Sequence, residues 1–203
     1  KKYPVVNEEH YQDLEPGYTN IYAFYHELTD LLEEGAQMVV SVGTARVAGS
    51  QASVIKKNQR FITNPNTASM GYGLPAAIGV SAAGGRETIC VTGEGSLQMN
   101  LQELQTILHN RLPIRIFVIN NQGYHSIRQT QRNYFGEPLV GVGEESGDLS
   151  FPGAAKTGRG LRISLLQLQI REDSERGFEG RSEAKPPCIC EVYATKYQKT
   201  EPK

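Results

Sequence analysis

A carboxylate and two asparagines are spaced along this chain as the ligands of a hard cation would be. Glu94 stands between two glycines directly after an apolar, β-rich run at residues 87–92, and the pair Asn120-Asn121 follows a second such run at residues 114–119. Oxygen ligands of this kind suit Mg²⁺, which takes few of its ligands from protein, and Ca²⁺ could substitute for it. The two motifs therefore predict half of a metal diphosphate site.

A helix should join the two apolar runs and set the position of both motifs. Leucine and isoleucine recur at helical spacing between residues 97 and 108, Ser96 can open the helix, and Leu112-Pro113 can end it. A strand, helix, strand crossover is almost always right-handed and parallel, so both motifs should reach the same carboxyl edge of a sheet. Free N–H groups at the start of the helix would attract phosphate there.

The rest of the chain continues the alternation of strands and helices. This pattern predicts an α/β fold with a doubly wound, mainly parallel sheet, helices on both faces and a ligand at the carboxyl edge. Residues 18–203 should form this domain, and the polar residues 1–17 should be a linker or arm lying on a neighbour. Residues 153–186 are expected to be irregular, because their first part carries three glycines that disfavour a helix and their second part is a charged loop.

Composition excludes several classes of function. The 203 residues carry a net charge of −1 with mixed signs, so neither nucleic acid nor an acidic membrane is an expected partner. No stretch is long and apolar enough to span a bilayer and the chain does not open on a signal peptide, so we expect a soluble, cytoplasmic protein. The cysteines at positions 90, 188 and 190 lie in expected strands, which favours core or partner-facing thiols over metal ligands.

The two motifs resemble those of thiamine diphosphate enzymes, in which Gly-Asp-Gly is followed about two dozen residues later by Asn-Asn. Here the runs are GEGS and VINNQGY, with Asn121 twenty-seven positions beyond Glu94. The resemblance implies that Glu94, the Asn121 side chain and the Gly123 carbonyl bind the Mg²⁺ that holds the cofactor diphosphate. Glu94 replaces the usual aspartate and is longer by one carbon–carbon bond, about 1.5 Å, so we expect altered or weaker metal binding.

Two further segments extend the resemblance. The run TNPNTASMGYGLPAAIGVSAA at residues 63–83 is similar to the segment that receives the aminopyrimidine ring. It implies that the Ala68 carbonyl accepts from the pyrimidine amino group and that Met70 wedges between the two rings, holding the cofactor bent. The run SVGTARVAG resembles the first strand end, with Gly43 and Thr44 beside the diphosphate. The same resemblance places other residues around the cofactor: Gly93, Gly95, Ser96, Gly123 and Tyr124.

Within this family the resemblance is to the carboxy-terminal cofactor domain of acetolactate synthase-like enzymes, over residues 18–152. The run NNQGYHSIRQTQRNYFG is closer to such proteins from bacterial surface-sugar loci than to the biosynthetic synthase, which carries Gly-Met-Val where this chain has residues 125–127. A different substrate pocket is therefore expected. His125 is the titratable candidate near it, either as a proton shuttle or carboxylate-binding group or as a solvent-facing loop residue.

The resemblance implies a thiamine diphosphate-dependent transferase or lyase. Its parent enzyme would decarboxylate a 2-oxo acid and join the product to an acceptor carbonyl, as a carboligase. In the family, a pyrimidine-binding domain of the partner subunit in a homodimer or tetramer supplies the glutamate that protonates the cofactor, and some members bind FAD in a middle domain. Nothing here matches either domain, so the isolated chain should be inactive. The alternatives are another thiamine diphosphate-dependent decarboxylase or aldehyde lyase, and a non-catalytic oligomerisation scaffold.

Overall fold

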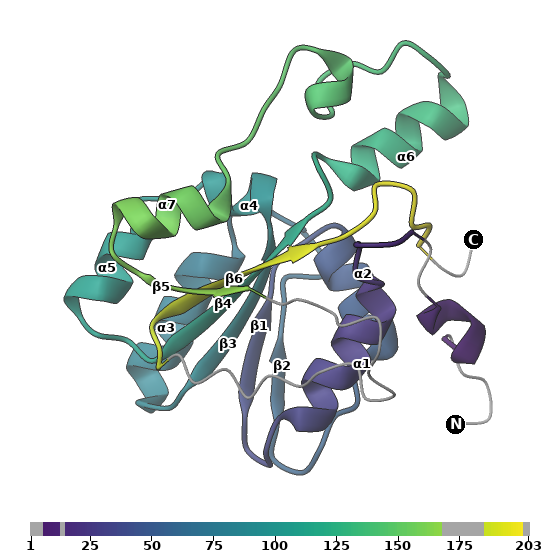
Figure 1. Ribbon diagram of the computed structural model, residues 1–203. Coiled ribbons are helices and arrows are strands. Elements are labelled where there is room, and N and C mark those ends of the chain that lie inside the picture. The colour runs from purple at the N-terminus through teal and green to yellow at the C-terminus, as the bar shows by residue number, and fades with distance from the viewer. Residues whose placement is uncertain (1–5, 13–14, 168–184, 201–203) are drawn as a thin grey trace.

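Six parallel strands form one sheet at the centre of the chain. The computed structural model describes residues 6–12, 15–167 and 185–200. The strands follow the order β2-β1-β3-β4-β6-β5 across the sheet, and every neighbouring pair is parallel (Figure 1). Their bounds are β1 Gln37–Val40, β2 Arg60–Ile62, β3 Thr88–Gly93, β4 Ile114–Asn120, β5 Ser164–Gln167 and β6 Cys188–Tyr193. The predicted parallel α/β sheet is confirmed.

Helices cover both faces of the sheet, as expected for a doubly wound fold (Figure 1). One face packs against α1 Ile21–Leu31 and α2 Thr44–Ala52. The other packs against α3 Gly73–Gly84, α5 Glu103–His109 and α7 Ala154–Gly160. The side chains of consecutive strand residues alternate between these two cores: Met38 and Val40 belong to the first, and Val39 belongs to the second. A strand buried on both faces needs an uninterrupted apolar run, which explains the sequence pattern.

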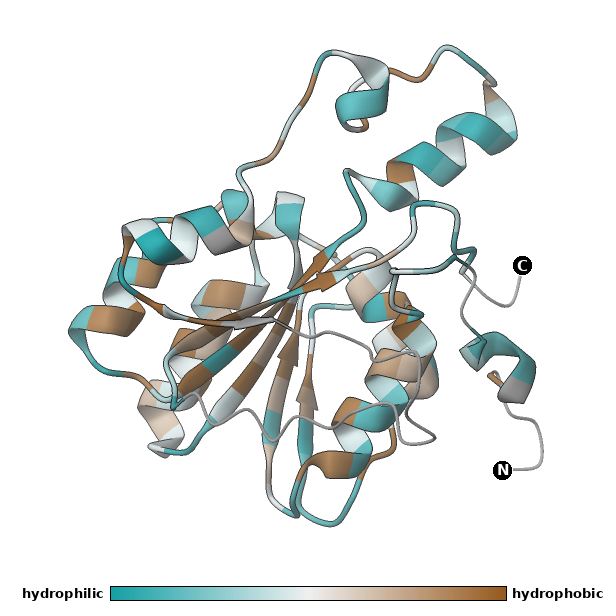
Figure 2. Cartoon of the chain, in the orientation of Figure 1, coloured by the Kyte–Doolittle hydropathy of each residue, from teal (hydrophilic) through white to brown (hydrophobic). Residues whose placement is uncertain are grey.

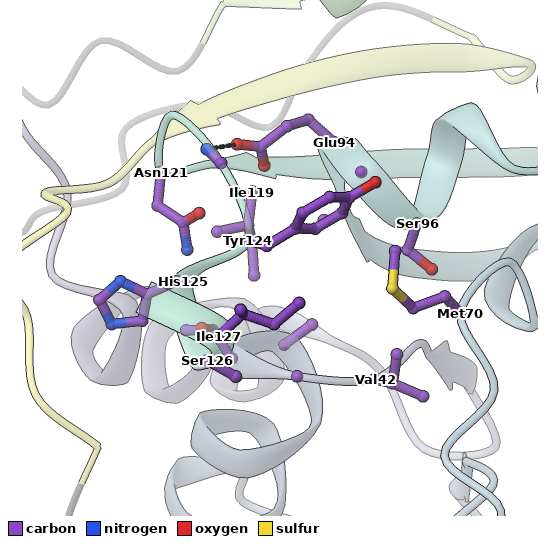
Figure 3. Close-up of a pocket in the computed structure, with 16 residues that line it drawn as sticks. Val42, Met70, Glu94, Ser96, Ile119, Asn121, Tyr124, His125, Ser126 and Ile127 are labelled. Carbon is purple, nitrogen blue, oxygen red and sulfur yellow. Dashed lines mark hydrogen bonds between the residues drawn. The ribbon is translucent and has the colours of Figure 1, made fainter. Parts of the chain in front are cut away.

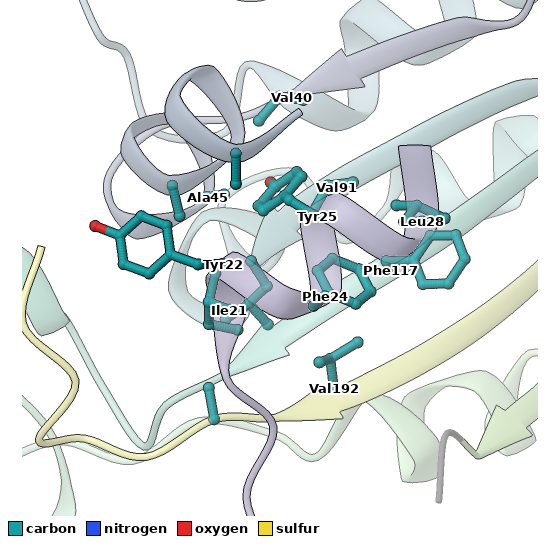
Figure 4. Close-up of a cluster of buried hydrophobic side chains, with 14 of the residues drawn as sticks. Ile21, Tyr22, Phe24, Tyr25, Leu28, Val40, Ala45, Val91, Phe117 and Val192 are labelled. Atoms are coloured by element: carbon teal, nitrogen blue, oxygen red, sulfur yellow. The ribbon is translucent and has the colours of Figure 1, made fainter. Parts of the chain in front are cut away.

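Hydrophobic residues gather along the central strands (Figure 2). On the α1 face, Phe24 packs against Phe117 of β4 with ring centroids 5.7 Å apart, and Val192 of β6 lies beside them (Figure 4). The three cysteines are buried in β3 and β6, which fits the predicted core thiols. Among the described residues, no helix is long and apolar enough to cross a membrane.

The amino end of α1 is tied to the last described residues. Asn20 caps the helix, its Oδ1 accepting from the N–H groups of Tyr22 and Ala23 at 2.9 and 3.3 Å. Gln198 lies against this cap: its Oε1 accepts from Ile21 N at 3.0 Å and its Nε2 donates to Asn20 Oδ1 at 3.0 Å. The last described residues therefore contact the capped amino end of α1.

An arm leaves the carboxyl edge of the sheet after β4. It consists of α6 His125–Tyr134, a loop, and the short 3-10 helix η2 Glu144–Ser146, and it projects above the body of the domain (Figure 1). The order of the strands reverses direction between β1 and β3, and ligands of open α/β sheets bind at the carboxyl ends of strands at such a switch point. The topology therefore indicates where the functional site should lie.

The predicted helix between β3 and β4 is broken into two pieces. A short helix, α4 Glu94–Gln98, begins two residues earlier than expected, and a turn separates it from α5. Asn100 in this turn donates from Nδ2 to the carbonyl of Gly71 at 2.9 Å, so the break secures the neighbouring loop. The helix after β3 is therefore only five residues long, and the phosphate site expected at its amino end stays a prediction.

The stretch predicted to be irregular contains regular structure in its first part, which corrects that expectation. Helix α7 and strand β5 both lie within residues 153–186, although residues 168–184 are outside the described part of the chain. Gly158 is buried, and a Cβ atom there would press on Leu165 of β5. Close packing of the helix on the sheet offsets the low helix propensity of glycine, which a local pattern cannot reveal.

The described part of the amino-terminal segment lies on its own domain. Val6 is buried in the core beneath α1, and the 3-10 helix η1 Glu8–Tyr11 places Tyr11 against His26 with ring centroids 5.2 Å apart. Asn20 Nδ2 donates to the carbonyls of His10 and Gln12 at 2.9 and 2.6 Å. Residues 6–12 thus contact α1, whereas we expected an arm that lies on a neighbour.

Candidate functional site

A cavity opens at the carboxyl edge of the sheet, where the loops after β1, β3 and β4 meet. Figure 3 shows residues from the three loops pointing into the same space. The lining comprises residues 42–45 after β1, Met70, residues 93–96 after β3, Ile119, Asn121 and residues 123–127. Every sequence-predicted site residue lines this cavity except Ala68.

Glu94 is the one carboxylate in the lining. It is 6% exposed, and its Oε1 accepts from the backbone N–H of Gly123 at 2.7 Å (Figure 3). Burial raises the pKa of this carboxyl to about 7, against the lowering effect of backbone N–H groups, chiefly that of Gly123, and of the Arg128 guanidinium. Glu94 forms no salt bridge within the described residues. The glutamate side chain, which is longer than the usual aspartate, reaches from the end of β3 to the turn after β4.

Asn121 supplies a second oxygen beside Glu94. The residue is 5% exposed, and its Oδ1 finds no hydrogen-bond partner among the residues that the structure describes. Leaving a buried amide oxygen unpaired costs about 1–3 kcal/mol. Figure 3 shows this side chain pointing into the cavity. An unpaired amide oxygen and a buried carboxylate form a donor set that fits Mg²⁺.

The third expected ligand is the Gly123 carbonyl. It already accepts from His125 N at 3.0 Å, which leaves its second lone pair for a cation. The described residues hold no cluster of three or more His, Cys, Asp or Glu side chains. Mg²⁺ does not require one, because it usually keeps several waters and takes one or two protein carboxylates together with phosphate oxygens. The residues present therefore fit the cation that the motifs predict.

Gly43 and Thr44 begin α2 on the opposite side of the cavity. Gly43 is the residue before the helix, with φ of 64°, and Thr44 Oγ1 is buried without a hydrogen-bond partner among the described residues. The amino end of this nine-residue helix, whose first N–H groups have no partner within the helix, lines the same cavity as Glu94 and Asn121. An anion there would satisfy both the hydroxyl and those N–H groups.

Met70 reaches the cavity from the loop before α3, across from Asn121 (Figure 3). Gly71, the next residue, donates its N–H to Ser96 Oγ at 2.8 Å, and Ser96 Oγ lies 2.7 Å from Ser41 Oγ. These buried hydroxyls link the ends of β1 and β3 to the Met70 loop. Ala68 is exposed with φ of 50° and lies outside the lining.

His125 lines the cavity but turns its ring away from Met70 and Ser96 (Figure 3). The residue is 4% exposed, its Nε2 lies 2.7 Å from the Gln198 carbonyl, and its Nδ1 lies 3.4 Å from Arg128 Nη1. Burial is the main cause that lowers the pKa of this imidazole to about 4. A neutral ring that donates to Gln198 and accepts from Arg128 has no nitrogen left for a substrate. The geometry favours a role in holding the carboxy-terminal segment.

Several residues around the site were not identified from the sequence. Val42, Ala45 and Ile119 are apolar residues of the lining. Ser126 and Ile127 also line the cavity, and they belong to residues 125–127, from which the sequence predicted a different substrate pocket. Ser41 and Arg128 do not line the cavity themselves but form hydrogen bonds with the lining residues Ser96 and Asn121. The side-chain contacts of Ser41 and Arg128 depend on segments far apart in the chain, so no local pattern could have singled these residues out.

Residues 41–192 match the family described as "Thiamine pyrophosphate enzyme, C-terminal TPP binding domain". The chain belongs to this family. The match covers the cavity and continues to β6, well beyond residue 152, where the sequence resemblance was expected to end. The predicted family is therefore confirmed, and β6 is part of the shared domain.

Curated relatives of this TPP-binding domain include acetolactate synthases. It is 31% identical to the acetolactate synthase large subunit of Porphyra purpurea over 175 residues, which are 86% of this chain and 29% of that protein. It is 34% identical to the acetolactate synthase isozyme 2 large subunit of Escherichia coli (strain K12) over 112 residues, or 55% of this chain and 20% of that protein. The chain thus spans less than a third of the length of either relative.

The raised pKa of Glu94 predicts how the stability of the metal-free domain depends on pH. Because the folded pKa of about 7 lies above that of an unfolded glutamate, the folded state holds a proton between about pH 4.5 and 7 that the unfolded chain has released. The free energy of unfolding should therefore fall as pH rises through this window. Urea unfolding of the chain at several pH values, with metal removed, measures this slope.

Substitution isolates the contribution of Glu94. In Glu94→Gln the side chain at position 94 is neutral at every pH, so the free energy of unfolding should no longer fall between about pH 4.5 and 7 on its account. Glu144→Gln changes an exposed glutamate of η2 and should leave this pH dependence unchanged. Saturating Mg²⁺ should also suppress it, because the cation favours the ionised carboxylate. Identical pH profiles for the wild type and Glu94→Gln would contradict the assignment.

Proposed function

We propose that this domain binds thiamine diphosphate through Mg²⁺ and forms the cofactor half of an acetolactate synthase-like enzyme that acts on 2-oxo acids. The observation that carries the proposal is the buried Asn121 Oδ1, which has no hydrogen-bond partner among the described residues, together with the buried Glu94 carboxylate in a domain of the TPP-binding family. Both oxygens belong to the cavity at the switch point of the sheet. A carboligase or decarboxylase is the reaction class that its similarity to acetolactate synthases supports.

Each side of the cavity would have a separate task. Glu94, Asn121 Oδ1 and the Gly123 carbonyl would hold the cation, and Thr44 Oγ1 with the first N–H groups of α2 would bind diphosphate oxygens. Met70 would support the cofactor rings from the loop before α3. When bound, the thiazolium ring supplies the electron sink that decarboxylation of a 2-oxo acid requires.

Apolar lining residues would keep the reacting region dry. Val42, Ile119 and Ile127 border the cavity and offer no polar side chain to water. Exclusion of water strengthens electrostatic interactions inside a site and prevents side reactions. Ser126, an exposed residue of the lining, is the polar side chain placed to contact a substrate, and with Ile127 it would set which acceptor fits.

The remaining parts of the enzyme are also proposals. We infer that the full protein is a homodimer or tetramer in which a partner subunit's pyrimidine-binding domain closes the cavity over Met70. Exposure of residues 65–69 beside Met70 supports this, because the loop that should receive the pyrimidine ring is open on one side. The small share of the relatives that this chain spans is consistent with further domains.

Calorimetric titration of the full-length protein tests the proposal. Thiamine diphosphate should bind in the presence of Mg²⁺ and not after removal of divalent cations, since the diphosphate and the carboxylate repel each other without a metal. Product analysis with pyruvate and an acceptor aldehyde or 2-oxo acid then separates carboligation from simple decarboxylation. Failure of the full-length protein to bind the cofactor with Mg²⁺ would contradict the proposal and favour a non-catalytic scaffold.

A further inference from the structure

Arg128 is the largest fully buried side chain of the protein's described part, although arginine is rarely buried without partners. It lies on α6, and its guanidinium reaches back beneath the turn that follows β4. Nη1 donates to the Asn121 carbonyl at 3.3 Å, and Nη2 donates to the Gln122 carbonyl at 2.8 Å. Nε donates to Glu145 of η2. One side chain therefore joins the arm to the turn that carries the proposed cation ligands.

The turn needs such support because its backbone is unfavourable. Gln122 has φ of 60° and Gly123 has φ of 143°, so two successive residues lie at positive φ, and a residue with a side chain costs about 1–2 kcal/mol there. On the cavity side, Glu94 accepts from Gly123 N. On the opposite side, the two hydrogen bonds from Arg128 are charge-assisted and about twice as strong as neutral ones. The turn is held from both sides.

We propose that Arg128 is a positioning residue for the cation site: by binding the carbonyls of Asn121 and Gln122 it fixes the turn that presents Asn121 Oδ1 and Gly123 to Glu94. The metal-binding part of this inference rests on the proposed function. Arg128 does not face the cavity itself and does not line it. Its effect on the cation would pass through the turn, because residues that form hydrogen bonds with metal ligands commonly orient those ligands.

Glu145 orients the guanidinium. Its carboxylate accepts from Arg128 Nε and also lies 3.1 Å from Lys196 Nζ and 3.6 Å from Arg132 Nη2. Arg132 is one turn further along α6 and touches the same carboxylate, but no contact with residues 121–123 is among its described interactions. It is therefore a matched control. Substitution of either arginine removes one cation near Glu145, and only substitution of Arg128 also releases the turn.

The experiment compares Arg128→Met, Arg128→Lys and Arg132→Met in the full-length protein, with two readouts. The first is hydrogen exchange of peptides spanning residues 119–124 in the cofactor-free state, which reports on opening of the Gly123 N–H bond to Glu94. The second is the apparent Kd for Mg²⁺ at a fixed concentration of thiamine diphosphate. Arg128→Met should accelerate exchange of this peptide and raise the Kd about 10- to 100-fold, the usual effect of losing a partner behind a metal ligand.

The other variants decide between positioning and a general effect on stability. Arg132→Met should leave both readouts within about twofold of the wild type. Arg128→Lys keeps the charge but lacks the planar fork, so it should give intermediate values, and it carries the test if Arg128→Met does not fold. The proposal would be overturned if the Arg128 variants showed the same hydrogen exchange in residues 119–124 and the same Kd for Mg²⁺ as Arg132→Met. If the wild type binds no metal, the proposed function fails, while the exchange comparison still decides whether Arg128 holds the turn.

Discussion

Asn121→Ala should strongly weaken the Mg²⁺-dependent binding of thiamine diphosphate. The substitution removes the buried Oδ1 that has no partner among the described residues, so the cation would lose an oxygen ligand while the protein loses no hydrogen bond of that atom. We expect the apparent Kd for the cofactor to rise by at least about 100-fold, which corresponds to roughly 2.7 kcal/mol. Calorimetry of the full-length protein at saturating Mg²⁺ measures this change.

Two further variants show whether the oxygen itself is responsible. Asn121→Asp keeps an oxygen at the same distance along the side chain and should retain metal-dependent binding. Asn110→Ala, an exposed asparagine at the end of α5 whose described contact is with Thr106, should leave the Kd unchanged. Equal binding by Asn121→Ala and the wild type would remove Asn121 from the cation site.

Gly123→Ala should disrupt both the turn and the site. A Cβ atom at this position would overlap the carbonyl oxygen of Val142 and lie 2.8 Å from Arg128 Nη2, and φ of 143° is itself unfavourable for alanine. We expect a loss of about 2–4 kcal/mol in the free energy of unfolding, from strain and displaced packing together. Metal-dependent cofactor binding should be lost as well, because Gly123 N can no longer meet Glu94. Urea unfolding and calorimetry give the two values.

The matched control for this prediction is another glycine of the arm. Gly136 also has positive φ, at 77°, but no atom lies within 4 Å of the position where a Cβ would be placed. Gly136→Ala should therefore cost only the conformational penalty, about 1 kcal/mol, and should leave cofactor binding intact. If both substitutions had the same effect, the close approach between Gly123 and Val142 would not matter in solution.

The sequence was most informative where neighbouring strands bring short motifs together. Glu94 and Asn121 could be paired because a parallel crossover brings consecutive strand ends to one edge, and β3 and β4 are indeed adjacent with Gly93 opposite Ile119. The family resemblance added Gly43, Thr44 and Met70, which line the same cavity. Ala68 was expected to contribute its backbone carbonyl and does not line the cavity of this chain.

Contacts between distant segments could not be predicted from local patterns. The break between α4 and α5 depends on Asn100 binding Gly71, and the helical state of Gly158 depends on β5. Arg128 was not distinguishable from a surface residue of a polar helix, because the carbonyls it binds and its partner Glu145 lie on either side of α6 in the sequence. Periodicity reports which face of a helix is apolar and says nothing about a buried charge.

The bridge from Gln198 to His125 and Ile21 also bears on how the protein is made. His125 begins the arm at residue 125, yet its partner carbonyl belongs to residue 198. At the usual elongation rate of about 5–20 residues per second, the ribosome needs roughly 4–15 s to travel from Asn121 to Gln198. The nascent chain can pair β1, β3 and β4 during this interval, while the start of the arm and the Ile21 end of the first helix still lack their last partner. The start of the arm and the amino end of α1 should therefore gain their Gln198 contacts only after these strands have paired.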